Sequence, residues 1–136
     1  MLQPKKEKYR KKFRGKMKGK SFRANKIAFG EFGLKSITRS WVKSTQLEAA
    51  RKAIVHCTKR KGKLWIRIFP DKSYTIKPAE VKMGGGKGDV EGYVAVVRPG
   101  RIIFELGGIE ENIARESFKR AGMKLPVRTK FITKGK

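Results

Sequence analysis

The sequence predicts an α+β fold: a two-layer sandwich in which two helices cover one face of a mixed or antiparallel sheet, with an extended basic N-terminal arm. Two segments carry apolar residues at helical spacing, and several shorter apolar runs between and after them are typical of strands. Residues 1–26 contain almost nothing that could build a core. We therefore expect a basic arm over 1–26 and a single α+β domain over 27–136, which includes a glycine-rich loop at 82–89.

The arm is distinguished by its charge. Residues 1–26 hold twelve Lys and Arg against one acid, Glu7, with single aromatics at Tyr9, Phe13 and Phe22. Such a segment cannot bury enough apolar surface to offset its backbone entropy, so a dense polyanion is its natural partner. The whole chain has a formal net charge of +25, of which +14 lies after residue 26. The composition therefore indicates a nucleic-acid-binding protein.

The first strand and helix follow the arm. Residues 27–37 are apolar but contain Gly30 and Gly33, which predicts an irregular or bulged strand. A helix is expected to begin at Ser44-Thr45, where Thr45 and Glu48 fit a capping box. Its inner face carries Leu47, Ala50, Ile54 and Cys57. It should end at the run Lys59-Arg60-Lys61-Gly62, because cations and then glycine favour a helix C-terminus.

The middle of the chain reads as strands. Residues 63–69 predict a strong strand, with Trp65 and Phe69 on one face, where we expect them in the core. Residues 72–81 form a looser extended stretch interrupted by Pro78. The apolar runs 92–97 and 101–106 are separated by Arg98-Pro99-Gly100. Because Pro-Gly suits the centre of a type II turn, we expect these two runs to form a β-hairpin.

The last elements are a helix and a strand. Residues 110–121 predict a helix with Glu110 and Glu111 in its first turn, where the helix dipole favours acids. Its inner face carries Ile113, Ala114, Ser117 and Phe118. Gly122 and Pro126 should end it, and residues 127–133 then alternate as a half-exposed final strand.

Nothing in the sequence favours catalysis. The only histidine, His56, adjoins the only cysteine, Cys57, and neighbours on a helix point apart rather than meet. The loop 82–89 lacks the glycine and Ser/Thr positions of a Walker A loop and the third glycine of a dinucleotide fingerprint. We expect no enzyme, no cofactor, no metal site and no membrane span.

The sequence also bears on whether the bound nucleic acid is RNA or DNA. The sequence has no helix-turn-helix signal, zinc-finger spacing or basic-zipper heptad. An arm of 26 residues can reach about 85 Å into irregular crevices, and basic segments commonly fold on structured RNA. Folded RNA is therefore favoured, and a non-specific or architectural DNA-binding protein is the alternative.

Four stretches also carry a family resemblance, and together they cover nearly the whole chain in order. They are MLQPKKEKYRKKFRGKMKG, FGEFGLKSITRSWVKSTQLEAARKAI, KLWIRIFPDKSYTIKPAEVKMGGGKG and ARESFKRAGMKLPVRTKFI. The chain resembles the bacterial-type ribosomal protein L-sixteen family of the large subunit. Many members have Arg where this chain has Lys82, so the charge is kept but the planar guanidinium is not.

The resemblance implies an α+β protein of the large ribosomal subunit, in the cytoplasm or a plastid. Its expected partners are large-subunit ribosomal RNA, neighbouring ribosomal proteins, and tRNA at the aminoacyl site near the peptidyl-transferase region; neither a membrane nor a homo-oligomer is expected. The tRNA-facing loop would comprise Lys82, Met83, Gly84, Gly85, Gly86, Lys87 and Gly88. The expected ribosomal-RNA contacts are Lys5, Lys6, Lys8, Arg10, Lys11, Lys12, Arg14, Lys16, Lys18, Lys20, Arg23, Arg51, Lys59, Arg60 and Lys61.

Overall fold

The computed structural model describes residues 25–75 and 90–135. In chain order the elements are β1 (Phe32–Ser36), β2 (Ser40–Lys43), α1 (Ser44–Thr58), β3 (Lys63–Ile66), β4 (Lys72–Thr75), β5 (Val90–Val97), β6 (Ile102–Gly107), α2 (Glu111–Gly122) and β7 (Thr129–Thr133). Both predicted helices are present: α1 begins at the expected Ser44 and ends just before the run Lys59–Gly62, and α2 is shifted by one residue from the expected 110–121. The predicted arm, apart from residues 25 and 26, and the loop 82–89 lie outside the described residues. Of the predicted extended stretch 72–81, residues 72–75 are described.

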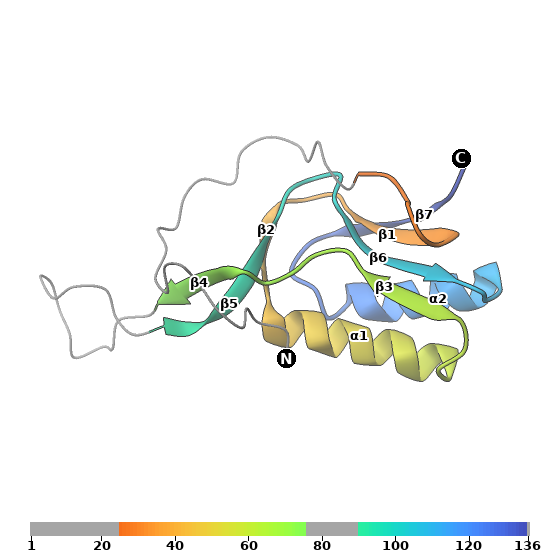
Figure 1. The fold of residues 1–136 in the computed structure, drawn as a ribbon, viewed down its shortest axis with the longest axis horizontal. Helices are drawn as coiled ribbons and strands as arrows, with labels where there is room; N and C mark the ends of the chain where they lie inside the picture. Colours follow the sequence, from red (N-terminus) through yellow and green to blue (C-terminus); the bar gives the residue numbers. More distant parts are fainter. Residues whose placement is uncertain (1–24, 76–89, 136) are drawn as a thin grey trace, which may run out of the picture.

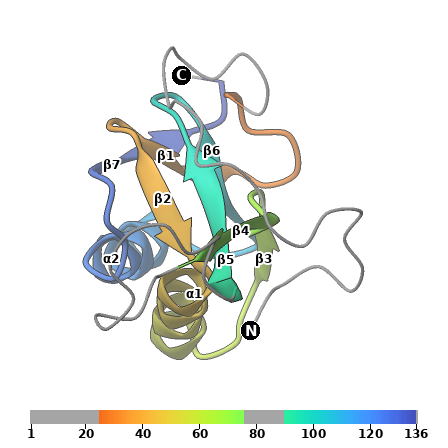
Figure 2. The same cartoon turned by 90° about the vertical axis from the view of Figure 1, so that its left-hand side faces the viewer.

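The strands form two antiparallel sheets. One has the order β3-β6-β1-β7 and the other the order β2-β5-β4. The chain passes from the first sheet to the second between β1 and β2 and between β3 and β4. It returns through α1 between β2 and β3, and again between β5 and β6. Helices α1 and α2 lie side by side on one face of the four-stranded sheet (Figures 1 and 2). The predicted α+β fold is confirmed.

The predicted hairpin is wrong, although its turn is real. The Arg101 amide donates to the Arg98 carbonyl at 3.2 Å, and Gly100 has a φ of +94°, as a type II turn requires. However, β5 pairs with β2 and β4, whereas β6 pairs with β1 and β3. The buried Ser36 holds the turn at the end of β1: its amide donates to Arg101 O and its hydroxyl to Arg98 O. Strand β1 thus occupies the edge of β6 that a hairpin partner would have needed.

The start of α1 also differs from its prediction. The short strand β2, which the sequence did not reveal, runs directly into the helix and makes Lys43 the N-cap. The Lys43 amide donates to Gln46 Oε1 at 2.9 Å, while Glu48 pairs with Arg51 instead of capping the helix. The predicted capping box is therefore two residues too late.

One apolar cluster joins both helices and both sheets. Leu47 and Ile54 of α1 and Phe118 of α2 pack against Phe104 of β6, and Val97 brings the second sheet into the same cluster. All five side chains are essentially inaccessible to solvent. Burial on this scale is what fixes the helices on the sheet, since each such side chain contributes about 1.5–3 kcal/mol.

The opposite face of the four-stranded sheet is covered by the segment that precedes β1. Glu105 of β6 stands between Trp65 of β3 and Gly33 of β1 in one cross-strand row. The Ile27 side chain lies over Gly33, where a Cβ would approach Ile27 Cγ1 to 3.0 Å. Residues 27–30 therefore cross the helix-free face, and the small size of Gly33 lets them lie close to it.

Candidate nucleic-acid interface

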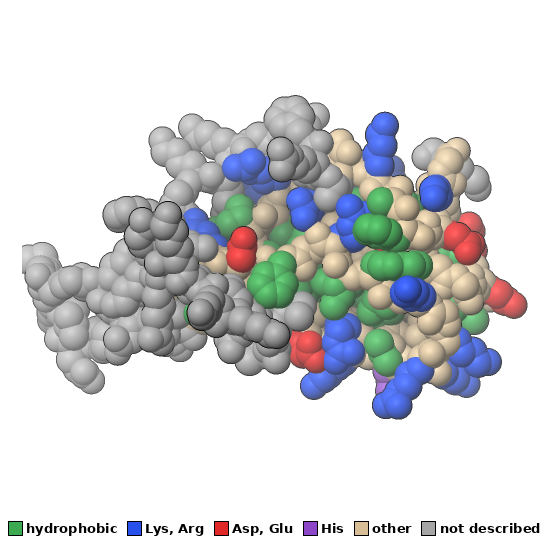
Figure 3. All heavy atoms as spheres, in the orientation of Figure 1, with side chains coloured by type: hydrophobic (Ala, Val, Ile, Leu, Met, Phe, Trp, Pro, Cys, Tyr) green, Lys and Arg blue, Asp and Glu red, His purple; other side chains and the backbone are tan. Residues whose placement is uncertain are grey.

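The solvent-facing side of α1 gathers positive charge. Arg51, Lys52, His56, Lys59 and Arg60 recur on one side of the helix and its C-terminal turn, where with Val55 they line a hollow of about 730 Å³. Figure 3 shows Lys and Arg side chains along the lower edge of the molecule, where α1 runs. A concave surface lined by one sign of charge attracts polyanions such as a nucleic-acid backbone.

Arg51 is partly neutralised by a neighbour. Its Nη2 lies 2.6 Å from Glu48 Oε1 one turn earlier on α1. The hydrogen bond from Arg51 lowers the pKa of Glu48, and the same bond raises the pKa of Arg51. Lys52, Lys59 and Arg60 form no ion pair with another described residue, so they determine the charge of the hollow.

The turn after α1 presents two cations in an unusual backbone conformation. Lys59 and Arg60 have φ values of 54° and 63°, and they are the only described non-glycine residues with positive φ. This left-handed region costs a side-chain-bearing residue about 1–2 kcal/mol. The Arg60 amide donates to Val55 O at 3.1 Å, which closes the helix end. The predicted glycine, Gly62, is also left-handed but comes after the cap.

The structure thus brings together three of the four predicted RNA contacts in the described residues. Arg51, Lys59 and Arg60 line the hollow, whereas Lys61 is exposed beyond it. The prediction missed Lys52 and His56, which could have been identified because Lys52, His56 and Arg60 follow one another at intervals of four residues. Of the remaining predicted contacts, Lys5 to Arg23 and Lys82 to Gly88 lie outside the described residues.

A second feature is an aromatic pair on the helix-free face, formed by the exposed Phe29 and the half-buried Trp65 of β3. The ring of Phe29 stacks on that of Trp65, with centroids 6.1 Å apart and planes 19° apart. Lys63 Nζ lies 5.3 Å from the Trp65 ring centroid and the Arg67 guanidinium 4.9 Å from that of Phe29. Figure 3 shows hydrophobic side chains in open view among cations over the region of β3 and β6.

The expected burial of two aromatics in the core is therefore wrong. Trp65 is half-buried on the helix-free face, and Phe69 is 47% exposed beyond the end of β3 at Ile66. The strand is shorter than predicted, so the alternation that would have placed both rings on one face stops before Phe69.

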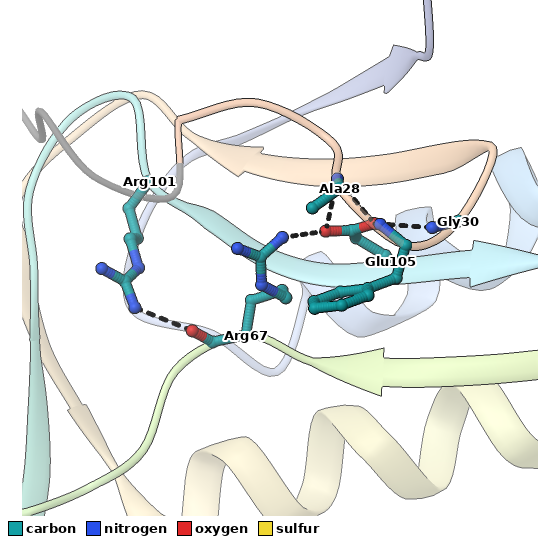
Figure 4. Close-up of polar contacts among 6 residues, drawn as sticks. Ala28, Gly30, Arg67, Arg101 and Glu105 are labelled. Carbon is teal, nitrogen blue, oxygen red and sulfur yellow. Dashed lines mark hydrogen bonds and ion pairs between the residues drawn. The ribbon is translucent and has the colours of Figure 1, made fainter.

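The aromatic pair is held in place by a buried carboxylate. Glu105 is wholly buried, and its Oε1 accepts hydrogen bonds from the amides of Phe29 and Gly30, each at 2.7 Å. The Ala28 amide also donates to it at 3.2 Å, and the Arg67 guanidinium forms an ion pair with Oε2. Figure 4 shows the carboxylate between Arg67 and the backbone of Ala28 and Gly30. Burial raises the pKa of Glu105, but the three amides and Arg67 together outweigh burial and lower it.

Arg67 is itself linked to the start of β6. Arg101 Nη2 donates to the Arg67 carbonyl at 2.8 Å (Figure 4). Burial and the nearby charge of Arg67 lower the pKa of Arg101. Two guanidinium groups and one carboxylate therefore join β6, the end of β3 and the segment before β1. The sequence signal was a single acid in the apolar run Ile102–Leu106, which the predictions left unused.

The described residues include neither a metal-ligand cluster nor a membrane-spanning helix. Within these residues, no group of three or more His, Cys, Asp or Glu side chains could hold a metal ion. No helix within residues 25–75 and 90–135 is long and apolar enough to cross a membrane.

The chain is similar to known proteins along almost its full length. The family model described as ribosomal protein L16p/L10e matches residues 4–132. A protein of Thermosipho melanesiensis named large ribosomal subunit protein uL16 is 57% identical over 132 residues, covering 97% of this chain and 93% of the relative. Proteins of the same name from Aquifex aeolicus and a Hydrogenobaculum species are 55% and 52% identical, each over 98% of this chain and 94% and 95% of their own length. The chain therefore belongs to the ribosomal protein L16p/L10e family.

Proposed function

We propose that this protein is a structural constituent of the large ribosomal subunit, where it binds large-subunit ribosomal RNA and neighbouring ribosomal proteins. The observation that carries the proposal is the identity of 52–57% to large-subunit proteins over nearly the whole chain. Family membership gives the chain a structural rather than an enzymatic role. It also disfavours the alternative of an architectural DNA-binding protein.

The cationic side of α1 supports an RNA-binding role for that surface. Lys52, Lys59 and Arg60 present their charges to solvent from one continuous side of the helix and its last turn. Contacts of this kind fix position and orientation on the phosphate backbone and carry little sequence information. We assign the same role to Arg51, Lys61 and the arm cations Lys5 to Arg23, since the arm carries the highest density of positive charge in the chain.

The glycine-rich loop is proposed to contact tRNA at the aminoacyl site. Lys82 and Lys87 flank Gly84-Gly85-Gly86, so the segment combines positive charge with a backbone that can approach a sugar-phosphate chain closely. The ribosome would be cytoplasmic or that of a plastid. Deleting Gly84–Gly88 removes no apolar residue. We expect the deletion to leave the protein incorporated and to weaken aminoacyl-site tRNA binding; unchanged tRNA affinity in ribosomes that contain the deletion would refute this role.

Sucrose-gradient sedimentation tests the main proposal. The tagged full chain should sediment with the large subunit at moderate salt, and nuclease digestion of the ribosomal RNA should release it. Recovery with chromosomal DNA, or in the free fraction at every salt concentration, would contradict the proposal.

A further inference from the structure

We propose that the Phe29–Trp65 pair is a binding site for one unpaired RNA base, which stacks on the solvent-accessible part of the two rings while its flanking phosphates lie near Lys63 and Lys134. The inference rests on the proposed function, because it takes RNA as the partner. It adds a second contact surface, on the helix-free face of the sheet and separate from the cations of α1.

The rings form one wall of a built hollow. Phe29 and Trp65 line a cavity of about 360 Å³ together with Lys63, Lys134 and Glu31. This volume lies in the range of roughly 300–1,000 Å³ that is typical of small-ligand pockets. Phe29 is 58% exposed, although large apolar side chains usually find cover in the core. An aromatic ring held rigidly in the open, among cations, is the arrangement by which proteins stack on unpaired bases.

Glycines keep the hollow open. Gly62, Gly107 and Gly108 line it, and a Cβ on Gly107 would lie 3.3 Å from the indole of Trp65. A Cβ on Gly62 would approach the Gly107 carbonyl oxygen to 2.5 Å, and both Gly62 and Gly108 have positive φ. The local backbone therefore excludes side chains from the space beside the indole, which leaves room for a flat group.

The backbone that carries Phe29 is held in place before any ligand binds. The amides of Phe29 and Gly30 are both held by Glu105, and Arg67 covers one face of the Phe29 ring. Binding to such a preorganised surface loses little conformational entropy. Because Glu105 is neutralised by Arg67 and is inaccessible to solvent, its charge does not repel a phosphate.

The charges favour RNA over a protein partner and indicate which bases fit. Lys63 and Lys134 flank the hollow, and Glu31 is the single carboxylate among the described residues that line it. The Gly108 amide donates to Glu31 Oε1 at 3.4 Å, a weak bond that leaves acceptor capacity on the carboxylate. A carboxylate accepts hydrogen bonds from base amino groups, so we expect guanine, which has an exocyclic amino group beside its ring N–H, to bind more tightly than uracil, which has no amino group.

Fluorescence of Trp65 tests the site directly. The full chain with Trp41→Phe contains Trp65 as its only tryptophan. It is titrated with a twelve-nucleotide unpaired RNA that has one central guanosine in a uridine background, and with the same RNA made abasic at that position. We expect the guanosine RNA to quench Trp65 emission and to bind roughly five- to hundredfold more tightly than the abasic RNA. The uridine-only RNA should lie between the two.

Two variants separate stacking from charge. Phe29→Ala should abolish the preference for guanosine over the abasic RNA and leave the dependence of affinity on salt unchanged, because no cation is removed. The matched control is Phe69→Ala, which removes an aromatic side chain of similar exposure beyond the hollow and should keep the preference.

Equal affinity for the guanosine and abasic RNAs would overturn the inference. Loss of the preference in Phe69→Ala to the same degree as in Phe29→Ala would do so as well. Quenching of Trp65 by RNA-free ribosomal proteins, but not by the guanosine RNA, would assign the rings to a protein partner and likewise refute it. In each case sedimentation with the large subunit decides the proposed function independently.

Discussion

Arg67 and Glu105 form an ion pair across the helix-free face of the four-stranded sheet, with the Glu105 side chain wholly buried and that of Arg67 17% exposed. The pair joins β6 to the residue after β3. The Glu105 carboxylate also accepts hydrogen bonds from the amides of residues 28–30, and these bonds fix that backbone segment on the sheet.

Removing the charge of Glu105 should strongly destabilise the fold. In Glu105→Gln, an amide group would face Arg67, and the guanidinium would lose the carboxylate with which it forms an ion pair. Breaking one partner of a buried pair costs about 3–5 kcal/mol. Urea unfolding at pH 7 measures this loss. The control Glu116→Gln breaks the exposed pair with Arg120 and should change the unfolding free energy by about 0.5 kcal/mol or less.

The contribution of Glu105 should also depend on pH. Its pKa in the folded protein lies below the ordinary value of 4.5, so the folded state favours the ionised form. The stabilisation is therefore fully present above about pH 4.5 and is lost as the pH falls through the folded-state pKa. The difference in unfolding free energy between the wild type and Glu105→Gln should shrink between pH 5 and pH 3, which urea titrations at several pH values would follow. A difference that stays constant over this range would contradict the assignment.

Gly30 is expected to tolerate no side chain. A Cβ there would lie 2.6 Å from the Leu106 carbonyl oxygen, which belongs to the backbone of β6 and has little freedom to move. Gly30→Ala should destabilise the protein by about 1–3 kcal/mol. Gly33→Ala is the comparison, because its nearest neighbours are the ends of the Ile27 and Ile132 side chains at 3.0–3.2 Å. Thermal unfolding should show the larger loss for Gly30→Ala; the reverse order would argue against this packing.

The cations after α1 should determine part of the salt dependence of RNA binding. Each phosphate contact contributes roughly 0.7–0.9 to the slope of log affinity against log salt. Replacing Lys59, Arg60 and Lys61 by Gln should therefore lower that slope by about two to three, as measured by filter binding to large-subunit ribosomal RNA. The charge-matched control replaces Lys119, Lys124 and Lys130 by Gln, since these three residues are exposed outside the hollow. It should lower the slope less than the replacement of Lys59, Arg60 and Lys61 does.

Lys59 offers a separate test of stability against binding. Glycine adopts its left-handed conformation without steric cost, so Lys59→Gly should raise the unfolding free energy by about 1 kcal/mol while weakening RNA binding. The control Lys52→Gly, inside α1, should instead lower it by about 1 kcal/mol. Stability is read from urea unfolding and affinity from the same filter-binding assay. A destabilised Lys59→Gly protein would show that the left-handed turn carries no strain.

The helices could be predicted from the sequence because their signals are local. Leu47, Ala50 and Ile54 repeat at helical spacing, and all three are buried in the structure. Strand pairing is a property of distant segments, which explains the wrong hairpin: the Pro99-Gly100 turn is encoded locally, but the competition of β1 for β6 is not. The family resemblance named the right family and fold but did not reveal which side chains meet.

In the candidate interface, too, local features could be predicted from the sequence, whereas contacts between distant residues could not. The run Lys59-Arg60-Lys61 is visible in the sequence, whereas the left-handed backbone that directs two of these residues is not. In the sequence, Phe29 stands out only as the first residue of the stretch FGEFGLKSITRSWVKSTQLEAARKAI, which carries part of the family resemblance. Its position depends on a hydrogen bond to Glu105, 76 residues away, and no local pattern could have indicated that contact.

The order of pairing in the four-stranded sheet has a consequence for synthesis of the chain. Strand β1 is made early, but its two partners are β6 and β7, and the last of these ends at Thr133. At roughly 5–20 residues per second, the growing chain needs about 5–20 s after β1 before both partners exist. Until β6 is complete at Gly107, β1 has neither native neighbour, and its backbone groups are open to foreign strands. One edge of β1 then stays unpaired until β7 has been made. The sheet can therefore close only after nearly the whole chain has been synthesised.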